Sequence, residues 1–180
     1  MESGLHSALW LDLDALFASP QRVAPFVEGL AALLRDVAPD AICGPLLGGA
    51  FLAQAVAAAL GVEFWYTERA PGNDGDGLFG AKYTLPSALH PRATGARVVI
   101  VDDVMSAGSS LRATYSNLQS LGSTVVGVGA LRVLGSRGES YFDDLQIPVR
   151  AVVRDNCEMW TPADCPLCAR GEAFSKLTPE

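Results

Sequence analysis

Residues 97–110 read RVVIVDDVMSAGSS, and this stretch decides the fold of the chain. Val98–Val101 is an uninterrupted run of β-branched residues, which is typical of a strand that is covered on both faces. Two aspartates follow directly, and then a turn of serine, alanine and glycine. Apolar residues return after the turn at helical spacing and predict a helix that Gly122 ends: Leu111, Tyr115, Leu118 and Leu121.

The segments on either side extend this pattern. Residues 124–131 form the next predicted strand, and a strand–loop–helix–strand unit implies parallel strands joined by a right-handed crossover. Ser19 and Pro20 suit the N-cap and first turn of a helix. Further predicted strands are 41–43, 62–66 and 149–153, and further predicted helices are 20–37 and 50–60. We therefore expect an α/β fold, with a mainly parallel sheet flanked by helices.

Composition limits the classes of protein that fit. The chain has 180 residues, 49% of them hydrophobic and 18% charged, which excludes a disordered chain and suits one domain. Its net charge of −7 argues against nucleic-acid binding, which usually needs a basic surface. No apolar run reaches the ~20 residues that span a bilayer, and the first residues do not read as a signal peptide. We expect a cytoplasmic protein that binds neither nucleic acid nor membrane.

The turn after the central strand has the chemistry of a phosphate site. In a parallel sheet, ligands bind beyond the carboxyl ends of the strands, where residues 106–110 are expected. The loop has no bulky side chain, so its amides can approach an anion, and the helix that follows adds its positive N-terminal end. Ser106, Ser109 and Ser110 add hydroxyl donors. The loop is neither a Walker loop nor a GxGxxG loop.

Asp102 and Asp103 narrow the choice of ligand. Two adjacent carboxylates would repel a phosphate that touched them, so they suit hydroxyl groups or a metal ion better. A ribose 5-phosphate meets both demands, with its phosphate on the amides and its 2- and 3-hydroxyls on the carboxylates. The alternative is that the two aspartates only polarise the strand end and the turn.

Residues 98–110 resemble the phosphoribosyl-pyrophosphate signature of type I phosphoribosyltransferases. Residues 44–49 resemble the pyrophosphate loop of that family, and Glu68-Arg69 resembles the start of its catalytic hood. The segment Cys165-Pro166-Leu167-Cys168-Ala169-Arg170-Gly171 is similar to the tail of some bacterial orotate phosphoribosyltransferases. These matches span residues 42–171, and the chain most resembles the orotate branch of the family.

The resemblance implies a single phosphoribosyltransferase domain over residues 1–180, with a core at about 38–155 and a hood from 1–37 and 156–180. It implies transfer of ribose 5-phosphate from phosphoribosyl pyrophosphate to a nucleobase, with Mg²⁺ as cofactor, in a homodimer. Orotate is the expected base, and orotidine 5-phosphate and pyrophosphate are the expected products.

The resemblance also assigns roles to residues. Asp102 and Asp103 hold the ribose hydroxyls and help to place the metal through substrate oxygens. Arg69 and Lys82 supply cations during catalysis. The remaining substrate-binding residues are Leu47, Gly48 and Gly49 at the diphosphate, Val104, Met105, Ser106, Ala107, Gly108, Ser109 and Ser110 around the 5-phosphate, and Arg132 at the base.

Two features differ from the orotate pattern. Residues 70–81 contain no Lys or Arg, and the arginine that should meet the base carboxylate is out of register, with Arg132 nearest and Arg137 as the alternative. A phosphoribosyltransferase for a purine or another base therefore stays open, as does a non-catalytic regulator that binds phosphoribosyl pyrophosphate. The turn-rich start of residues 70–96 predicts a lid.

Four cysteines occur in the chain, and Cys165 and Cys168 form a CxxC pair. A zinc site usually needs two such pairs or added histidines. Because His6 and His90 are far away in sequence, we expect zinc only with Cys157 or across a dimer. The alternatives are reduced thiols or a local disulfide.

Overall fold

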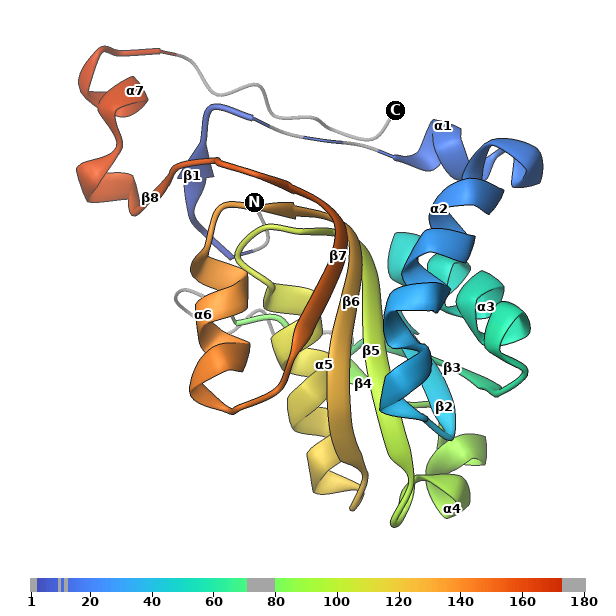
Figure 1. Cartoon of the computed structure of the whole chain (residues 1–180). Coiled ribbons are helices and arrows are strands. Elements are labelled where there is room, and N and C mark those ends of the chain that lie inside the picture. The colour runs from blue at the N-terminus through green and yellow to red at the C-terminus, as the bar shows by residue number, and fades with distance from the viewer. Residues whose placement is uncertain (1–2, 10, 12, 71–79, 173–180) are drawn as a thin grey trace.

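A six-stranded sheet forms the centre of the computed structural model, which describes residues 3–9, 11, 13–70 and 80–172. The strands are β2 (Ala41–Pro45), β3 (Glu63–Arg69), β4 (Tyr83–Thr84), β5 (Arg97–Met105), β6 (Thr124–Leu134) and β7 (Val149–Asp155). Their order across the sheet is β4-β3-β2-β5-β6-β7 (Figure 1). Neighbouring strands are parallel except at the edge, where the short β4 runs antiparallel to β3.

Helices cover both faces of this sheet. On one face lie α2 (Pro20–Leu34) and α3 (Gly48–Leu60), and on the other lie α5 (Ser109–Ser120) and α6 (Arg137–Asp144), as Figure 1 shows. The predicted α/β fold is thus confirmed. Shorter helices are α1 (Asp14–Phe17), α4 (His90–Ala93) and α7 (Pro166–Ala169), with 3₁₀ turns at Arg35–Val37, Ser87–Leu89 and Pro162–Asp164. None of the helices described is long and apolar enough to cross a membrane.

The apolar strand β5 explains why both faces are covered. Side chains alternate along a strand, so Val98 and Ile100 enter the core beneath α5 and α6, whereas Val99 and Val101 enter the core beneath α2 and α3. All four are fully buried. A strand with apolar side chains on both faces is stable only between two helical layers.

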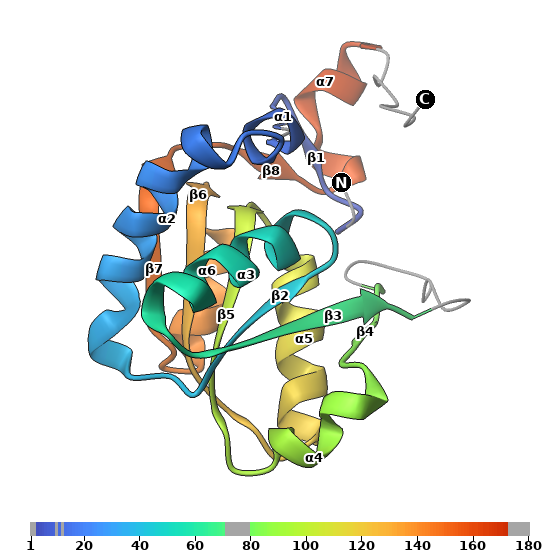
Figure 2. The same ribbon diagram turned by 90° about the vertical axis from the view of Figure 1, so that its right-hand side faces the viewer.

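The helix α2 lies in a different place from the one predicted. We expected residues 1–37 in the hood, but the apolar stripe of α2 packs on β6, β7 and α3. The stripe is buried because it follows the helical period and needs an apolar partner. The described part of the hood is smaller: β1 (His6–Ser7) pairs with β8 (Met159–Trp160), and both lie with α7 at the carboxyl end of the sheet (Figures 1 and 2).

Several elements are longer than predicted. β5 includes Asp102–Met105, because Asp102 and Val104 still pair with β6. β6 continues to Leu134, so Arg132 lies inside a strand rather than after it. The helix α6 was not predicted at all. Residues 71–79 of the predicted lid lie outside the described residues, and the rest of 70–96 includes β4 and α4.

Phe142 on α6 tests how much this unpredicted helix contributes to the core. Its ring is fully buried and meets the rings of Tyr115 and Tyr141 edge to face. We expect Phe142→Ala to lower the free energy of unfolding by about 3–5 kcal/mol, because it leaves a cavity in the core. The measurement is urea unfolding. The matched control is Phe26→Ala on α2, where the ring is 39% exposed and the loss should be less than half as large; equal losses would contradict this account of the core.

Candidate active site

Two adjacent carboxylates mark the carboxyl end of β5. Asp102 is 8% exposed, its Oδ2 accepts a 2.6 Å hydrogen bond from the Ser110 hydroxyl, and its Oδ1 accepts one of 3.1 Å from the Asp103 amide. The Asp103 Oδ1 accepts a 2.8 Å bond from the amide of Val104. Burial, followed by the charge of Asp103, raises the pKa of Asp102 well above its ordinary value. The site therefore holds a crowded acidic pair.

The first residues of α3 approach this pair closely. A Cβ atom at Gly48 would lie 2.5 Å from Asp103 Oδ2, and one at Gly49 would lie 2.8 Å from Asp102 Oδ1. A side chain at either position would force the neighbouring carboxylate to shift, and at Gly49 it would also meet the Pro45 ring, so glycine favours this close approach. The positive N-terminal end of this 13-residue helix thus faces the two negative charges. The loop before it is tightly folded, and its Leu46–Leu47 peptide bond is cis.

The predicted phosphate turn leads from β5 into α5. Gly108 is the N-cap of α5 and has a φ of +73°, a conformation that favours glycine. The carbonyl of Ser106 accepts a 3.1 Å bond from the amide of Gly138, so the start of α6 braces the turn. The Ser110 hydroxyl, which we expected to face a phosphate, donates to Asp102 instead. The first amides of α5 have no acceptor within the helix and can receive an anion.

Two side chains of the predicted set support this turn from inside the fold. Met105 is fully buried in the core beneath α5 and α6, and Ala107 is 2% exposed against Leu5 and Met159. These side chains fix the path of the backbone, which leaves the amides to face the ligand. At the other loop, Leu47 is 64% exposed.

A cavity of about 430 Å³ beside α5 brings two cations to the phosphate turn. It is lined by residues that include Lys82, Ser109 and Arg112. The Arg112 guanidinium stacks 4.3 Å from the Tyr141 ring, and its Nη2 donates to the carbonyl of Arg137. Burial lowers the pKa of Arg112. Arg112 was missed in the sequence, although a cation in the first turn after a phosphate loop was a usable signal.

The predicted cations Arg69 and Lys82 come together where β3 and β4 meet. The Lys82 carbonyl accepts a 2.9 Å bond from the amide of Ala70, which directly follows Arg69. Antiparallel pairing of Arg69 with Tyr83 fixes this register. The structure thus places both basic residues at the same sheet edge, although thirteen positions separate them in sequence.

Arg132 lies on β6 beside β5 and β7 and forms a 2.5 Å ion pair with Asp155. Hydrogen bonding to this arginine lowers the pKa of the Asp155 carboxyl. Asp155 lines a cavity of about 580 Å³ at the carboxyl ends of β6 and β7, and Arg137 and Trp160 line it too. Of the two arginines considered for the base carboxylate, Arg137 lines this cavity and Arg132 is ion-paired with a residue that lines it.

Similarity to known proteins agrees with this geometry. The sequence matches the phosphoribosyl transferase domain over residues 13–159, most of the chain. The chain belongs to the phosphoribosyltransferase family. It is 32% identical over 173 residues to the orotate phosphoribosyltransferase of Carboxydothermus hydrogenoformans, with 95% of this chain and 83% of the relative covered. It is 31% identical to the orotate phosphoribosyltransferase of Thermus thermophilus, with 98% and 90% covered.

Solved structures place this phosphoribosyltransferase in the same fold. The adenine phosphoribosyltransferase of Thermoanaerobacter pseudethanolicus superposes with a TM-score of 0.68 at 22% identity, covering 81% of this chain and 88% of the other. The orotate phosphoribosyltransferase of Aeropyrum pernix gives 0.65 at 22% identity, covering 82% and 80%. The family activity is that of a pentosyltransferase, and enzymes for two different bases share the fold.

The buried carboxylate of this phosphoribosyltransferase should make its stability depend on pH. Because the pKa of Asp102 is raised in the folded state, its ionisation destabilises the fold as the pH rises through that pKa, and the effect is absent below the pKa of an unfolded aspartate, about 3.9. We expect Asp102→Asn to raise the urea midpoint at pH 7 without substrate or metal, and the gain to vanish near pH 4.

The control for this prediction is Glu28→Gln, which removes an exposed charge on α2 and should leave the midpoint unchanged. A loss of stability in Asp102→Asn at pH 7 would contradict the assignment of a destabilising buried charge. The Ser110 hydroxyl can still donate to the asparagine oxygen, so the hydrogen bond itself is kept in the variant.

Proposed function

We propose that this protein transfers ribose 5-phosphate from phosphoribosyl pyrophosphate to orotate and releases pyrophosphate. The observation that carries the proposal is the placement of Asp102 and Asp103 between the amide turn at the start of α5 and the N-terminal end of α3. One edge of the sheet therefore offers hydroxyl acceptors flanked by two anion-binding helix ends. The names of the relatives support the choice of base.

The ribose half of the mechanism follows from this placement. The 5-phosphate is received by the first amides of α5 and the turn before it, and the 2- and 3-hydroxyls donate to Asp102 and Asp103. A base nitrogen then attacks the anomeric carbon while the bond to the diphosphate breaks, and negative charge grows on the leaving group. Catalysis is mainly positioning and charge stabilisation.

The diphosphate half uses the start of α3. The amides of Gly48 and Gly49 and the positive end of the helix face the growing charge. The proposal assigns Arg69 and Lys82 as cations for the diphosphate, whereas Arg112 lies beside the phosphate turn. The carboxylates of Asp102 and Asp103 are hard oxygen donors that suit Mg²⁺, directly or through substrate oxygens. When bound, Mg²⁺ neutralises charge on the diphosphate.

The proposed binding site for the base is the cavity at the carboxyl ends of β6 and β7. Orotate carries a carboxylate that needs a cation when it is taken out of water. Arg137 lines this cavity, and Arg132 reaches its wall through Asp155. Trp160 adds an aromatic face on which a flat base can stack. A purine would use stacking and backbone contacts but not the arginines.

The remaining expectations belong to the same proposal. We propose a homodimer in the cytoplasm. The predicted lid belongs to the same proposal, and its residues 71–79 lie outside the described residues. The pairing of β3 with β4 sets Arg69 beside Tyr83, so the chain leaves and re-enters the sheet edge on either side of residues 70–82.

A panel of bases tests the function directly. Pyrophosphate release is measured with Mg²⁺, phosphoribosyl pyrophosphate and either orotate, adenine, guanine or hypoxanthine. Turnover with orotate alone supports the proposal, and turnover with a purine alone contradicts the choice of base. Binding of phosphoribosyl pyrophosphate without turnover on any base would favour the non-catalytic regulator.

Gly108→Val separates a phosphate-site defect from a folding defect. The variant forces a β-branched residue into a positive φ at the turn, so the amides no longer converge on the phosphate. We expect the KM for phosphoribosyl pyrophosphate to rise about tenfold or more, as a lost charged hydrogen bond would produce, with a smaller change in the KM for the base. Gly122→Val is the matched control, because Gly122 has a φ of +83° at the far end of α5. Equal rises in both variants would point to strain alone.

Arg132→Ala tests the base half. If its guanidinium receives the carboxylate of orotate, kcat/KM for orotate should fall. The ratio of the two values should correspond to a loss of about 1.5–3 kcal/mol in transition-state binding, the size of a hydrogen bond to a charged group. The KM for phosphoribosyl pyrophosphate should stay unchanged. Arg150→Ala is the control, because Arg150 is ion-paired at the other end of β7. Full orotate activity in both Arg132→Ala and Arg137→Ala would mean that the carboxylate is held elsewhere.

A further inference from the structure

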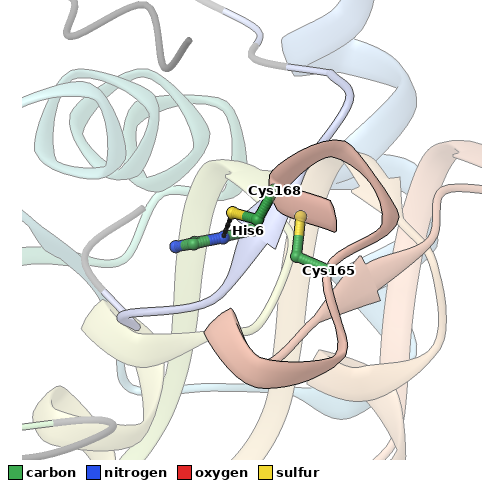
Figure 3. Close-up of side chains that lie close together, drawn as sticks. All are labelled: His6, Cys165 and Cys168. Atoms are coloured by element: carbon green, nitrogen blue, oxygen red, sulfur yellow. Dashed lines mark hydrogen bonds between the residues drawn. The ribbon is translucent and has the colours of Figure 1, made fainter. Parts of the chain in front are cut away.

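A histidine from one end of the chain meets two cysteines from the other. His6 lies on β1, and Cys165 and Cys168 lie at the start and within α7 (Figure 3). The pairing of β1 with β8 brings them together, because His6 stands opposite Trp160 in that register. One ligand atom of each residue lies within 4.8 Å of the other two. The cluster is separate from the carboxylates and the phosphate turn of the proposed transferase site.

The spacing of the three ligand atoms suits a small metal ion. A tetrahedral zinc with bonds of about 2.3 Å to sulfur and 2.0–2.1 Å to nitrogen holds its ligand atoms roughly 3.5–3.8 Å apart. The His6 Nδ1 and the Cys168 Sγ are 3.3 Å apart and joined by a hydrogen bond. Small side-chain rotations would bring all three atoms to the coordination distance.

Cys165 and Cys168 are free thiols, and Cys165 is only 2% exposed. The thiolate is the form of cysteine that binds metal, so the CxxC turn offers two sulfur ligands beside the imidazole of His6.

We propose that His6, Cys165 and Cys168 form a zinc site, with water in the fourth position. Two sulfurs and one imidazole nitrogen form a donor set that selects zinc over Mg²⁺, which prefers oxygen ligands. The proposed site differs from our expectation that zinc would need Cys157 or a second copy of the chain. That expectation rested on distance in sequence, which the β1–β8 pairing removes.

Cys157 stands outside the cluster. Its sulfur lies 3.3 Å from the hydroxyl of Ser7, the neighbour of His6 on β1. Successive side chains of a strand point to opposite faces, so Cys157 and the imidazole of His6 lie on opposite sides of β1. This thiol is therefore a matched control, near the site in space but turned away from it.

A zinc ion at this site would hold β1, β8 and α7 in place over the phosphate turn. Leu5, next to His6, is 1% exposed and packs with Met159 of β8 against Ala107 of the turn. A metal that ties β1 to α7 would hold this apolar contact in place.

Zinc content of the purified full-length chain tests the site. The protein is prepared under reducing conditions, stripped with a chelator, dialysed against zinc and analysed by mass spectrometry of metals. We expect about one zinc per chain in the wild type and in Cys157→Ser, and at least about tenfold less in His6→Gln and Cys168→Ser. Zinc should raise the Tm of the first two proteins but not of the last two. Circular dichroism at low temperature establishes that each variant is folded.

Three results would overturn the site. One is a wild-type chain that holds no zinc after reduction and dialysis. Another is equal loss of zinc in Cys157→Ser and Cys168→Ser. A third is an intact mass that lacks two hydrogens under reducing conditions, which would place a stable disulfide between Cys165 and Cys168. Substitution with Co²⁺ gives a second readout, because thiolate–cobalt absorption should appear in the wild type and be lost in Cys168→Ser. None of these measurements depends on which base the enzyme uses.

Discussion

The carboxylates of Asp102 and Asp103 lie side by side at the carboxyl end of the buried strand β5. This pair of like charges constrains the loops and helix ends around it. Asp102 is almost out of water and stands next to a second carboxylate, an arrangement that opposes folding when both are ionised. The fold offsets it with a serine hydroxyl, two backbone amides and the positive end of α3. The close approach of α3 is favoured because Gly48 and Gly49 have no side chains to displace the carboxylates. The same charges are useful once sugar hydroxyls arrive, since ionised carboxylates are strong acceptors.

The central part of the fold could be predicted because its signal is local. The run Val98–Val101 is apolar at every position, and a strand of that kind must be covered on both faces. Strand ends were harder to predict, since Asp102–Met105 and Arg132–Leu134 continue the ladder through backbone pairing that side chains do not report. The helix α6 was missed because most of its residues are polar and only Gly138 and Phe142 are buried. The stripe on α2 predicted a buried face, but a stripe does not say which element covers it.

The candidate site also has one part that the sequence could predict and another part that it could not. The phosphate turn and the acidic pair are contiguous in sequence, so their chemistry could be recognised from residue types alone. Contacts between segments that are far apart in the chain could not be predicted from the sequence. We expected the Ser110 hydroxyl to bind phosphate, but it donates a hydrogen bond to Asp102. Arg112 reaches the site through the packing of α5 against α6, and His6 meets Cys168 only after β1 and β8 have paired.

In the proposed mechanism the two substrate halves lie on different elements of the fold. The proposed ribose phosphate half is built from β5, α5 and the start of α3, where close glycine contacts and the core beneath restrict the backbone. The proposed base half lies at β6, β7 and β8, where side chains such as Arg137 and Trp160 line an open cavity. Under the proposal, side chains at that cavity can change without moving the amides of the turn. The adenine and orotate enzymes that superpose on this chain show that the backbone fold is shared, with TM-scores of 0.68 and 0.65. The proposal therefore assigns specificity for the base to a few charged side chains at the cavity, and binding of the ribose phosphate to the backbone of the turn.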